Sequence, residues 1–295
     1  MATGYVFPGQ GSQFPGMGKD LYEKYADVRE IYERAKVIAG FNVAEISFEA
    51  DKETLSRTQY TQPCIFVHSF AALTAMARKA QYDAVAGHSL GEYCALVAAK
   101  SISFEDGLAA LAERGRLMAA AKEGTMLAPI GASLDDVQSV VADLQQEGII
   151  EIANYNAPGQ FVISGEKAIL DKAAEMLKSK GVKKVVPLAV SGAFHSPLMA
   201  EAAKEMEKML ATIEFRAPQV AFYANVTGDR VENPQEIRKN LVLQLTSSVQ
   251  WIKTIESMMR DGHSSFVEVG PGKVLQGLIK RIAESANAVS WDAVQ

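Results

Sequence analysis

The sequence Gly-His-Ser-Leu-Gly at residues 87–91 constrains the fold more than any other stretch of this chain. It matches the G-x-S-x-G nucleophile elbow, in which two glycines let a strand turn sharply into a helix and leave the serine exposed. Residues 82–86 form a short run that can end a buried strand, and residues 92–100 are rich in Ala, Leu and Val without Gly or Pro. We therefore expect a strand, a turn at Ser89 and a helix that begins near Leu90, with its N–H groups facing the serine oxygen.

Size and charge limit the classes of protein to consider. The chain has 295 residues, of which 48% are hydrophobic and 22% charged, which is enough for a full core. A net charge of −5 argues against nucleic-acid and membrane-surface partners, which require a surplus of Lys and Arg. Without a signal peptide or a bilayer-length apolar run, a cytoplasmic protein is expected. Cys64 and Cys94 lack C-x-x-C spacing, so we expect buried free thiols and no metal site.

The order of patterns before and after the elbow predicts an α/β fold. A short strand at 4–8 breaks into a glycine-rich loop at 9–13, which is either a tight turn or a loop that faces a ligand. A surface helix is expected over 20–39, and a buried helix over 64–77 with Pro63 at its start. This strand-helix-strand-helix order implies a parallel sheet.

A second pattern lies between residues 125 and 190. Strands are predicted at 125–132, 149–156, 160–164 and 184–190, with helices at 134–146 and 167–180. This β-α-β-β-α-β order predicts a ferredoxin-like subdomain over 124–190, inserted into an α/β domain of residues 1–123 and 191–295. The active site is then expected in the cleft between the two units. Pro129 lacks an N–H, so the first of these strands is expected to be an edge strand or to carry a bulge.

An exposed serine needs a base, and the chain has four histidines. His88 is adjacent to Ser89, but neighbours at a sharp turn point apart. His68 lies in an apolar helix, which favours a satisfied core residue, and His263 follows a polar turn typical of a solvated histidine. His195 lies in a loop of small residues at the predicted junction of the two units, and it is the preferred base.

Seven motifs together give the chain a family resemblance. They are FPGQGSQ (7–13), TQP (61–63), GHSLGE (87–92), RG (114–115), NYNAPGQ (154–160), GAFHS (192–196) and EVGPG (268–272). In this order they resemble the malonyl-CoA:acyl carrier protein transacylases of fatty acid synthesis. The resemblance implies a hydrolase-like α/β domain with an inserted ferredoxin-like subdomain.

The resemblance also implies roles for the residues around the elbow. Ser89 would attack the thioester of malonyl-CoA to form an acyl-serine, and His195 would take its proton and later return one to the leaving thiol. A backbone carbonyl orients the histidine in this family, and Gln250 is expected to supply it. The backbone N–H groups of Gln10 and Leu90 would form the oxyanion hole.

Other residues are implied to select the acyl group. Arg114 would pair with the free carboxylate of the malonyl group through two parallel hydrogen bonds, a role that an arginine on a helix does not otherwise suggest. Phe194 either favours malonyl over methylmalonyl or simply packs. Asn156 and Gln62 are expected to line the cleft, with Met118 as an apolar wall.

Malonyl-CoA and acyl carrier protein are the implied substrates, with no bound cofactor, and the enzyme is expected to be a monomer. Because acyl carrier proteins are acidic, the basic pairs at 183–184 and 280–281 are candidates for docking, although such pairs are commonly solvated. Two alternatives remain. A serine thioesterase or hydrolase would share the elbow, and a non-catalytic acyl-CoA-binding protein would share the fold.

Overall fold

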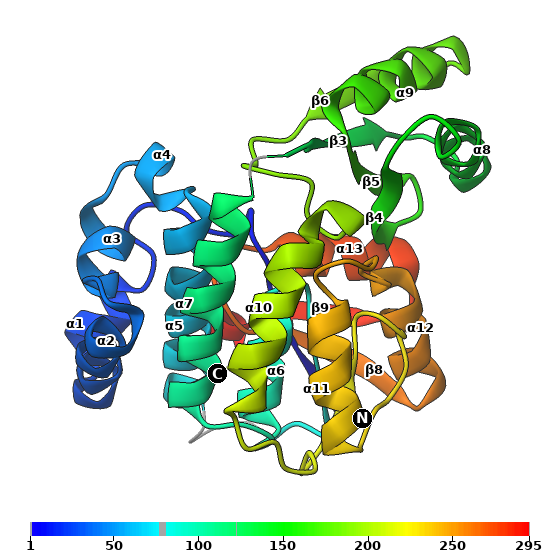
Figure 1. Cartoon of the computed structure of the whole chain (residues 1–295). Coiled ribbons are helices and arrows are strands. Elements are labelled where there is room, and N and C mark those ends of the chain that lie inside the picture. The colour runs from blue at the N-terminus through cyan, green and yellow to red at the C-terminus, as the bar shows by residue number, and fades with distance from the viewer. Residues whose placement is uncertain (1, 77–80, 122, 295) are drawn as a thin grey trace.

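A five-stranded parallel sheet with the strand order β7-β2-β1-β8-β9 forms the centre of the larger part of the protein. Helices surround this sheet (Figure 1). The computed structural model describes residues 2–76, 81–121 and 123–294. The strands of this sheet are β1 (Ala2–Phe7), β2 (Ala84–Gly87), β7 (Ala221–Tyr223), β8 (His263–Glu268) and β9 (Asn287–Ser290). The sheet confirms the predicted α/β class.

Both faces of this sheet are buried, because its side chains alternate between two cores. Tyr5 and Phe7 of β1 join the larger core with α5, α6 and α7, whereas Val6 joins a second core with Trp251 of α12 and Leu278 of α13. The helices around the sheet are α1 (Lys19–Lys24), α2 (Ala26–Ala39), α3 (Val43–Glu49), α4 (Lys52–Leu55), α5 (Thr58–Met76), α6 (Gly91–Ala98), α7 (Phe104–Ala120), α10 (Ala200–Ala211), α11 (Pro234–Leu243), α12 (Trp251–Arg260) and α13 (Val274–Ile282). Short 3-10 helices cover Pro197–Met199 and Trp291–Ala293.

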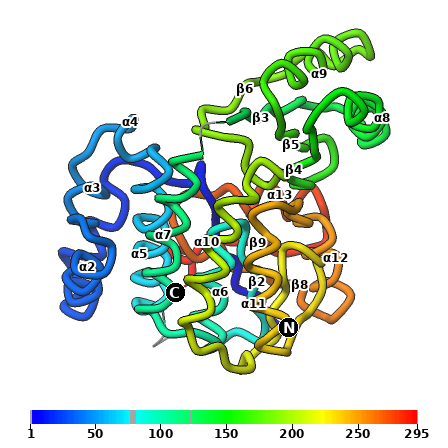
Figure 2. Tube along the Cα trace, in the orientation of Figure 1, coloured from blue at the N-terminus to red at the C-terminus, as the bar shows by residue number. Residues whose placement is uncertain are grey.

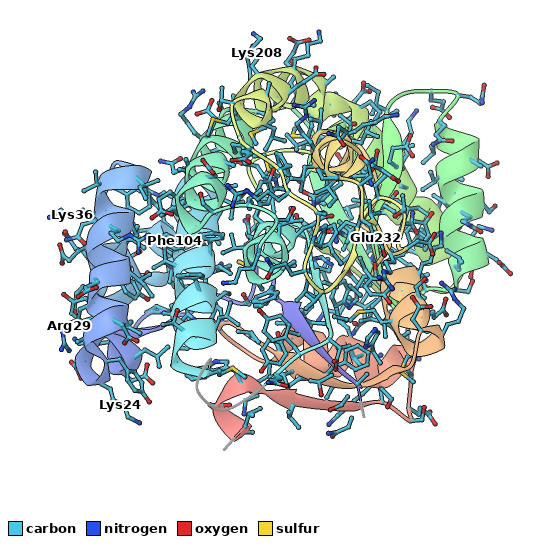
Figure 3. The ribbon with its side chains drawn as sticks, turned by 90° about the horizontal axis from the view of Figure 1, so that it is seen from below. Lys24, Arg29, Lys36, Phe104, Lys208 and Glu232 are labelled. Carbon is cyan, nitrogen blue, oxygen red and sulfur yellow. The ribbon has the colours of Figure 1, made fainter. Side chains whose placement is uncertain are left out.

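Two helices differ from the sequence prediction. The helix expected over 20–39 is broken at Tyr25, which is extended, into α1 and α2. Arg29 compensates the break, since its guanidinium donates hydrogen bonds to two backbone carbonyls of α1. As expected for a surface helix, α2 buries one side, with Val28, Ile31 and Ala35, while Arg29 and Lys36 point outward (Figure 3). Helix α5 begins at Thr58, so Pro63 lies inside it and not at its start.

A four-stranded antiparallel sheet with the order β4-β5-β3-β6 forms the second unit. Its elements are β3 (Thr125–Ile130), α8 (Leu134–Leu144), β4 (Ile150–Ala157), β5 (Gln160–Gly165), α9 (Lys167–Ser179) and β6 (Lys184–Pro187). They confirm the predicted β-α-β-β-α-β order. The trace in Figure 2 gathers these elements at one corner of the molecule, beside α13 and away from α1 and α2.

The prediction for Pro129 is wrong, because β3 is a central strand between β5 and β6 and no bulge interrupts its register with either neighbour. Its register with β5 runs without a shift from Thr125 to Ile130, but the ladder has no pairs at Ala128 and Pro129. A proline has no N–H to donate, so the ladder is interrupted there on the β5 side. Pairing continues on the other side, where Pro129 lies opposite Val185 of β6.

The C-terminal segment is more ordered than its sequence suggests. Residues 285–294 show little sequence periodicity, yet β9 extends the large sheet and Trp291 Nε1 donates a hydrogen bond to Gly270 O at 3.1 Å. Cys64 and Cys94 are buried free thiols, as predicted. Within the described ranges, none of the helices has both the length and the apolar character needed to cross a membrane.

Candidate active site

The Ser89 elbow lies where the carboxyl ends of β1 and β2 meet. The two strands are in parallel register with Phe7 opposite Gly87, so the loop after β1 runs beside the elbow. A side chain at Gly87 would come within 2.0 Å of Gly91, and one at Gly91 within 2.2 Å of the Phe7 carbonyl. The two glycines of the motif are therefore required by close backbone approach.

Ser89 has a φ of 52°, in the left-handed region that a serine rarely adopts. Hydrogen bonds on both sides hold this conformation. The backbone N–H of Ser89 donates to Asn225 Oδ1 at 2.7 Å, and its carbonyl accepts from Gln244 Nε2 at 3.0 Å. Asn225 and Gln244 are both fully buried, and no sequence motif indicated either of them.

His195 lies beside the serine, with 3.0 Å between His195 Nε2 and Ser89 Oγ. His195 Nδ1 donates to the backbone carbonyl of Gln244 at 2.7 Å, which places the proton on Nδ1 and leaves Nε2 as the acceptor. Burial and the nearby charge of Arg114 lower the pKa of His195 to about 3. The imidazole is therefore neutral near pH 7, as a general base for the serine must be.

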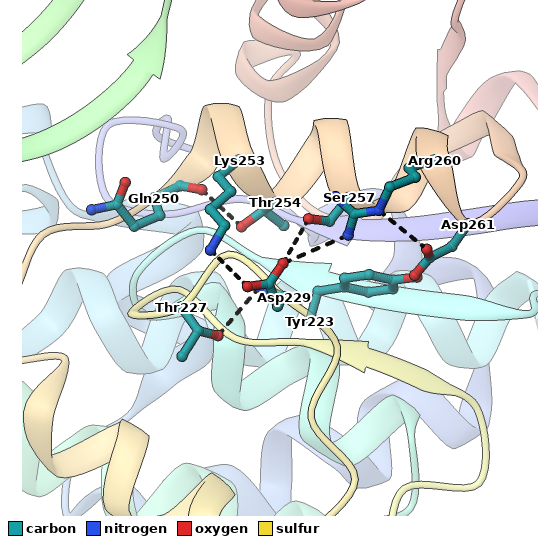
Figure 4. Close-up of polar contacts among 9 residues, drawn as sticks. All are labelled: Tyr223, Thr227, Asp229, Gln250, Lys253, Thr254, Ser257, Arg260 and Asp261. Atoms are coloured by element: carbon teal, nitrogen blue, oxygen red, sulfur yellow. Dashed lines mark hydrogen bonds and ion pairs between the residues drawn. The ribbon is translucent and has the colours of Figure 1, made fainter.

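The assignment of Gln250 as the group that orients the base is wrong. Gln250 precedes α12, where its carbonyl accepts a hydrogen bond from Thr254 Oγ1 at 3.0 Å (Figure 4). Its backbone N–H donates a hydrogen bond to the carbonyl of Asn225 at 2.8 Å, and Asn225 in turn contacts Ser89, so Gln250 supports the elbow only indirectly. The carbonyl that contacts the base belongs to Gln244, six positions earlier in the sequence and directly after α11.

Arg114 brings a positive charge to the same place. Its side chain is only 1% exposed and donates to Gln62 Oε1 at 2.7 Å, Ser89 Oγ at 3.1 Å and Gln244 Oε1 at 2.9 Å. All three acceptors are neutral, and among the described residues no carboxylate lies within salt-bridge distance of Arg114. A buried guanidinium with only neutral contacts is suited to an anionic ligand.

A small pocket of about 110 Å³ joins these groups. It holds roughly four water volumes, which suits a short acyl group. Its lining comes from both units of the protein and comprises Gln10, Gln62, His88, Ser89, Leu90, Arg114, Met118, Met126, Asn154, Leu188, Val190, Phe194 and His195. The pocket therefore lies between the two sheets, where the cleft was expected.

The oxyanion-hole candidates are well placed in this pocket. Gln10 and Leu90 both line it, and in the described part of the chain neither backbone N–H donates a hydrogen bond to another protein group. The prediction for Asn156 is corrected. Asn154 lines the pocket, whereas Asn156 Oδ1 contacts His88 Nε2 at 2.7 Å outside the lining.

The other histidines are unsuited to be the base. The contact with Asn156 occupies His88 Nε2, and burial lowers the pKa of His88. His68 is buried as expected, but its Nδ1 has no hydrogen-bond partner among the described residues. His263 is not solvated, because it opens the buried strand β8 and is 7% exposed.

The chain is similar to known acyltransferases over nearly its full length. Residues 4–294 match the acyl transferase domain family. A malonyl CoA-acyl carrier protein transacylase of Staphylococcus aureus strain MRSA252 is 40% identical over 297 residues, covering 99% of this chain and 96% of that protein. A Bacillus subtilis protein of the same name is 38% identical over 283 residues, covering 94% of this chain and 89% of that protein.

Solved structures show the same similarity. An acyl carrier protein S-malonyltransferase from Vibrio cholerae superposes with a TM-score of 0.95 at 37% identity, covering 100% of both chains. A malonyl-transacylase in complex with its type II PKS acyl-carrier protein superposes with a TM-score of 0.94 at 35% identity, covering 98% of this chain and 96% of that one.

Proposed function

The chain belongs to the acyl transferase domain family, and we propose that it transfers the malonyl group of malonyl-CoA to the phosphopantetheine thiol of acyl carrier protein. One observation carries the proposal: a serine with a neutral histidine 3.0 Å from its oxygen shares a small pocket with a buried arginine that contacts only neutral groups. Ser89 and His195 carry out the acyl transfer, and Arg114 selects an acyl group that has a carboxylate.

In the first half-reaction, Ser89 Oγ attacks the thioester carbonyl carbon of malonyl-CoA while its proton passes to His195 Nε2. The C–S bond then breaks, and the leaving thiolate of coenzyme A takes that proton from His195. The product is a malonyl ester on Ser89. The carbonyl of Gln244 keeps the Nδ1 proton in place throughout, so that only Nε2 exchanges protons with the reactants.

The second half-reaction reverses these steps with a different thiol. The phosphopantetheine thiol of acyl carrier protein gives its proton to His195 and attacks the ester carbonyl of malonyl-Ser89. The C–O bond breaks and Ser89 Oγ recovers the proton. Each tetrahedral intermediate places a negative oxygen toward the backbone N–H groups of Gln10 and Leu90, and losing such a donor typically costs on the order of a hundredfold in rate.

Selection of the acyl group is assigned to Arg114. Its Nη2 donates to Ser89 Oγ at 3.1 Å, so the guanidinium lies within reach of the carboxylate of a malonyl group carried on that oxygen. Gln62 fixes the other Nη atom, and it also donates to Met118 Sδ at 3.3 Å, which links the charged end of the pocket to an apolar wall. Phe194 lines the pocket beside the base and limits its width.

Several coarser features are part of the same proposal. The unit over 124–190 is taken as an inserted subdomain, which its separate core and its antiparallel sheet support. We infer a cytoplasmic monomer that uses malonyl-CoA and acyl carrier protein as substrates without a resident cofactor. The exposed basic pairs 183–184 and 280–281 are the candidate docking residues for the acidic carrier protein.

A serine hydrolase with the same elbow is the main alternative. Such an enzyme commonly orients its histidine with a carboxylate, whereas here a backbone carbonyl does so. Incubation with malonyl-CoA, with and without acyl carrier protein in its phosphopantetheine form, separates the two functions. We expect malonyl-acyl carrier protein to accumulate, while release of free malonate without any malonyl-carrier would contradict the proposal.

A further inference from the structure

A buried carboxylate lies directly behind the elbow and has no part in the mechanism above. Glu92 is in the first turn of α6, three residues after Ser89, and is only 1% exposed. Its Oε1 accepts the backbone N–H of Asn225 at 3.2 Å, and its Oε2 accepts a hydrogen bond from Gln244 Nε2. Burial raises the pKa of Glu92 to about 8, although these two donors and the Arg114 charge lower it. Both oxygens face N–H donors, which is the geometry of the ionised carboxylate, the form that predominates above about pH 8.

The side chain of Gln244 connects this carboxylate to the selection arginine. Its Nε2 donates to Glu92 and to the Ser89 carbonyl, and its Oε1 accepts from Arg114 Nη2 at 2.9 Å. The two ends of an amide differ, since one is a donor and the other an acceptor. Only one of the two orientations of the Gln244 amide satisfies all three neighbours.

Glu92 selects that orientation. An ionised carboxylate only accepts hydrogen bonds, so the NH₂ end of Gln244 must face it and the oxygen must face Arg114. In the flipped orientation the oxygen of Gln244 would face the carboxylate and the Ser89 carbonyl, and its NH₂ would face the guanidinium. Every contact would then join two acceptors or two donors, which is costly in a site closed to water.

We propose that Glu92 is a positioning residue for acyl selection: its carboxylate fixes the orientation of the Gln244 amide, and through it the position of the Arg114 guanidinium. The proposal rests on the proposed function, because it takes Arg114 to bind the malonyl carboxylate. Glu92 itself touches no reacting atom, and its effect reaches the substrate through the Gln244 amide and through its charge near Arg114.

The substitution Glu92→Gln tests this directly, because it keeps the size of the side chain and gives it a donor at one end. The introduced amide faces two donors, the backbone N–H of Asn225 and Nε2 of Gln244, but its single oxygen can accept a hydrogen bond from only one of them. Its NH₂ group then favours the flipped Gln244 amide, whose oxygen is turned away from Arg114. At about pH 9, where Glu92 of the wild type is ionised, we expect the ratio of malonyl to acetyl transfer from coenzyme A onto Ser89, followed by mass spectrometry, to fall about tenfold or more, the loss typical of a hydrogen bond to a charged group.

Glu268→Gln is the matched control. Glu268 is also a buried carboxylate, but it accepts the backbone N–H groups of Leu275 and Gln276 at the start of α13, away from the pocket. Its variant is expected to keep the wild-type ratio of malonyl to acetyl transfer. A purely structural role for Glu92 predicts a lower melting temperature and an equal loss for both donors, and that result would overturn the proposal.

Gln244→Met gives a second, independent test, since it removes the amide while keeping the backbone carbonyl that holds His195. The ratio should fall in this variant, and Glu92→Gln should add nothing further in the double variant. An unchanged ratio in folded Glu92→Gln or in Gln244→Met, or independent losses in the double variant, would refute the role of Glu92. A wild-type protein that forms no malonyl adduct would instead refute the proposed function.

Discussion

Replacing Arg114 with alanine should change the choice of acyl donor more than any other single substitution. A guanidinium paired with the malonyl carboxylate makes two charge-assisted hydrogen bonds, each worth about 1.5–3 kcal/mol. Their sum of about 3–6 kcal/mol corresponds to a loss of about 10²–10⁴-fold in kcat/KM for malonyl-CoA. Acetyl-CoA has no carboxylate, so this loss does not apply to it. The ratio of malonyl to acetyl kcat/KM should therefore fall at least about a hundredfold.

The assay is the rate of acyl-enzyme formation from each donor, measured separately by quenched mass spectrometry. Arg116→Ala is the matched control, because Arg116 is an exposed arginine on the same helix and pairs with Glu113. That variant should keep the wild-type ratio. If Arg114→Ala is folded and retains the wild-type preference for malonyl-CoA, the assignment of Arg114 as the carboxylate-binding residue is refuted.

Three further predictions follow from the same geometry. Asn225→Ala removes the acceptor that holds the strained Ser89, so kcat/KM should fall by about tenfold for both donors alike, and a change confined to malonyl-CoA would contradict this. The pKa of His195 is lowered to about 3, so kcat/KM should show no ionisation of the base between pH 8 and pH 5; an apparent pKa near 6.5 assigned to His195 would contradict this. Burial also lowers the pKa of His68 to about 4, and because unfolded histidines take up protons below about pH 6.5, stability should decrease as pH falls. In urea unfolding, the free energy of unfolding should fall by about 2 kcal/mol for each of His68 and His195 between pH 7 and pH 5. An equal free energy of unfolding at pH 7 and pH 5 would contradict the neutral state of these buried histidines.

Much of the fold could be predicted because its signals are local. The strand-turn-helix around Ser89 and the β-α-β-β-α-β order both follow from hydrophobic period and from glycine placement within short windows. The C-terminal strand β9 could not be predicted in this way. Its four residues are stabilised by parallel pairing with β8, which is remote from any local pattern.

The carbonyl that orients His195 illustrates what a sequence hides. Every residue has a backbone carbonyl, so nothing in the side-chain pattern separates Gln244 from Gln250. The choice depends on where α11 ends, since the residue just after that helix lies against the base. The side chain of Gln244 then gains its role only because Glu92 and Arg114 lie on either side of it in the fold.

The family resemblance predicts Asn156 in the pocket, whereas Asn154 lines it, and this error has a different cause. Side chains of a strand alternate between its faces, and two residues of the same parity normally share a face. The register of β4 with β5 shifts between Ile152 and Asn154 and again between Tyr155 and Ala157. Bulges of this kind redirect side chains, so Asn154 enters the pocket while Asn156 contacts His88.

The most direct test of the central claim is to identify the covalent intermediate. The wild-type protein should be mixed with malonyl-CoA without carrier protein, quenched in acid and digested, and the peptide that contains Ser89 should be analysed by mass spectrometry. We predict a malonyl adduct on Ser89 that is absent from Ser89→Ala and disappears when acyl carrier protein is added, with the malonyl group recovered on the carrier thiol. Carrier protein that becomes malonylated while Ser89 never carries the group would contradict the account.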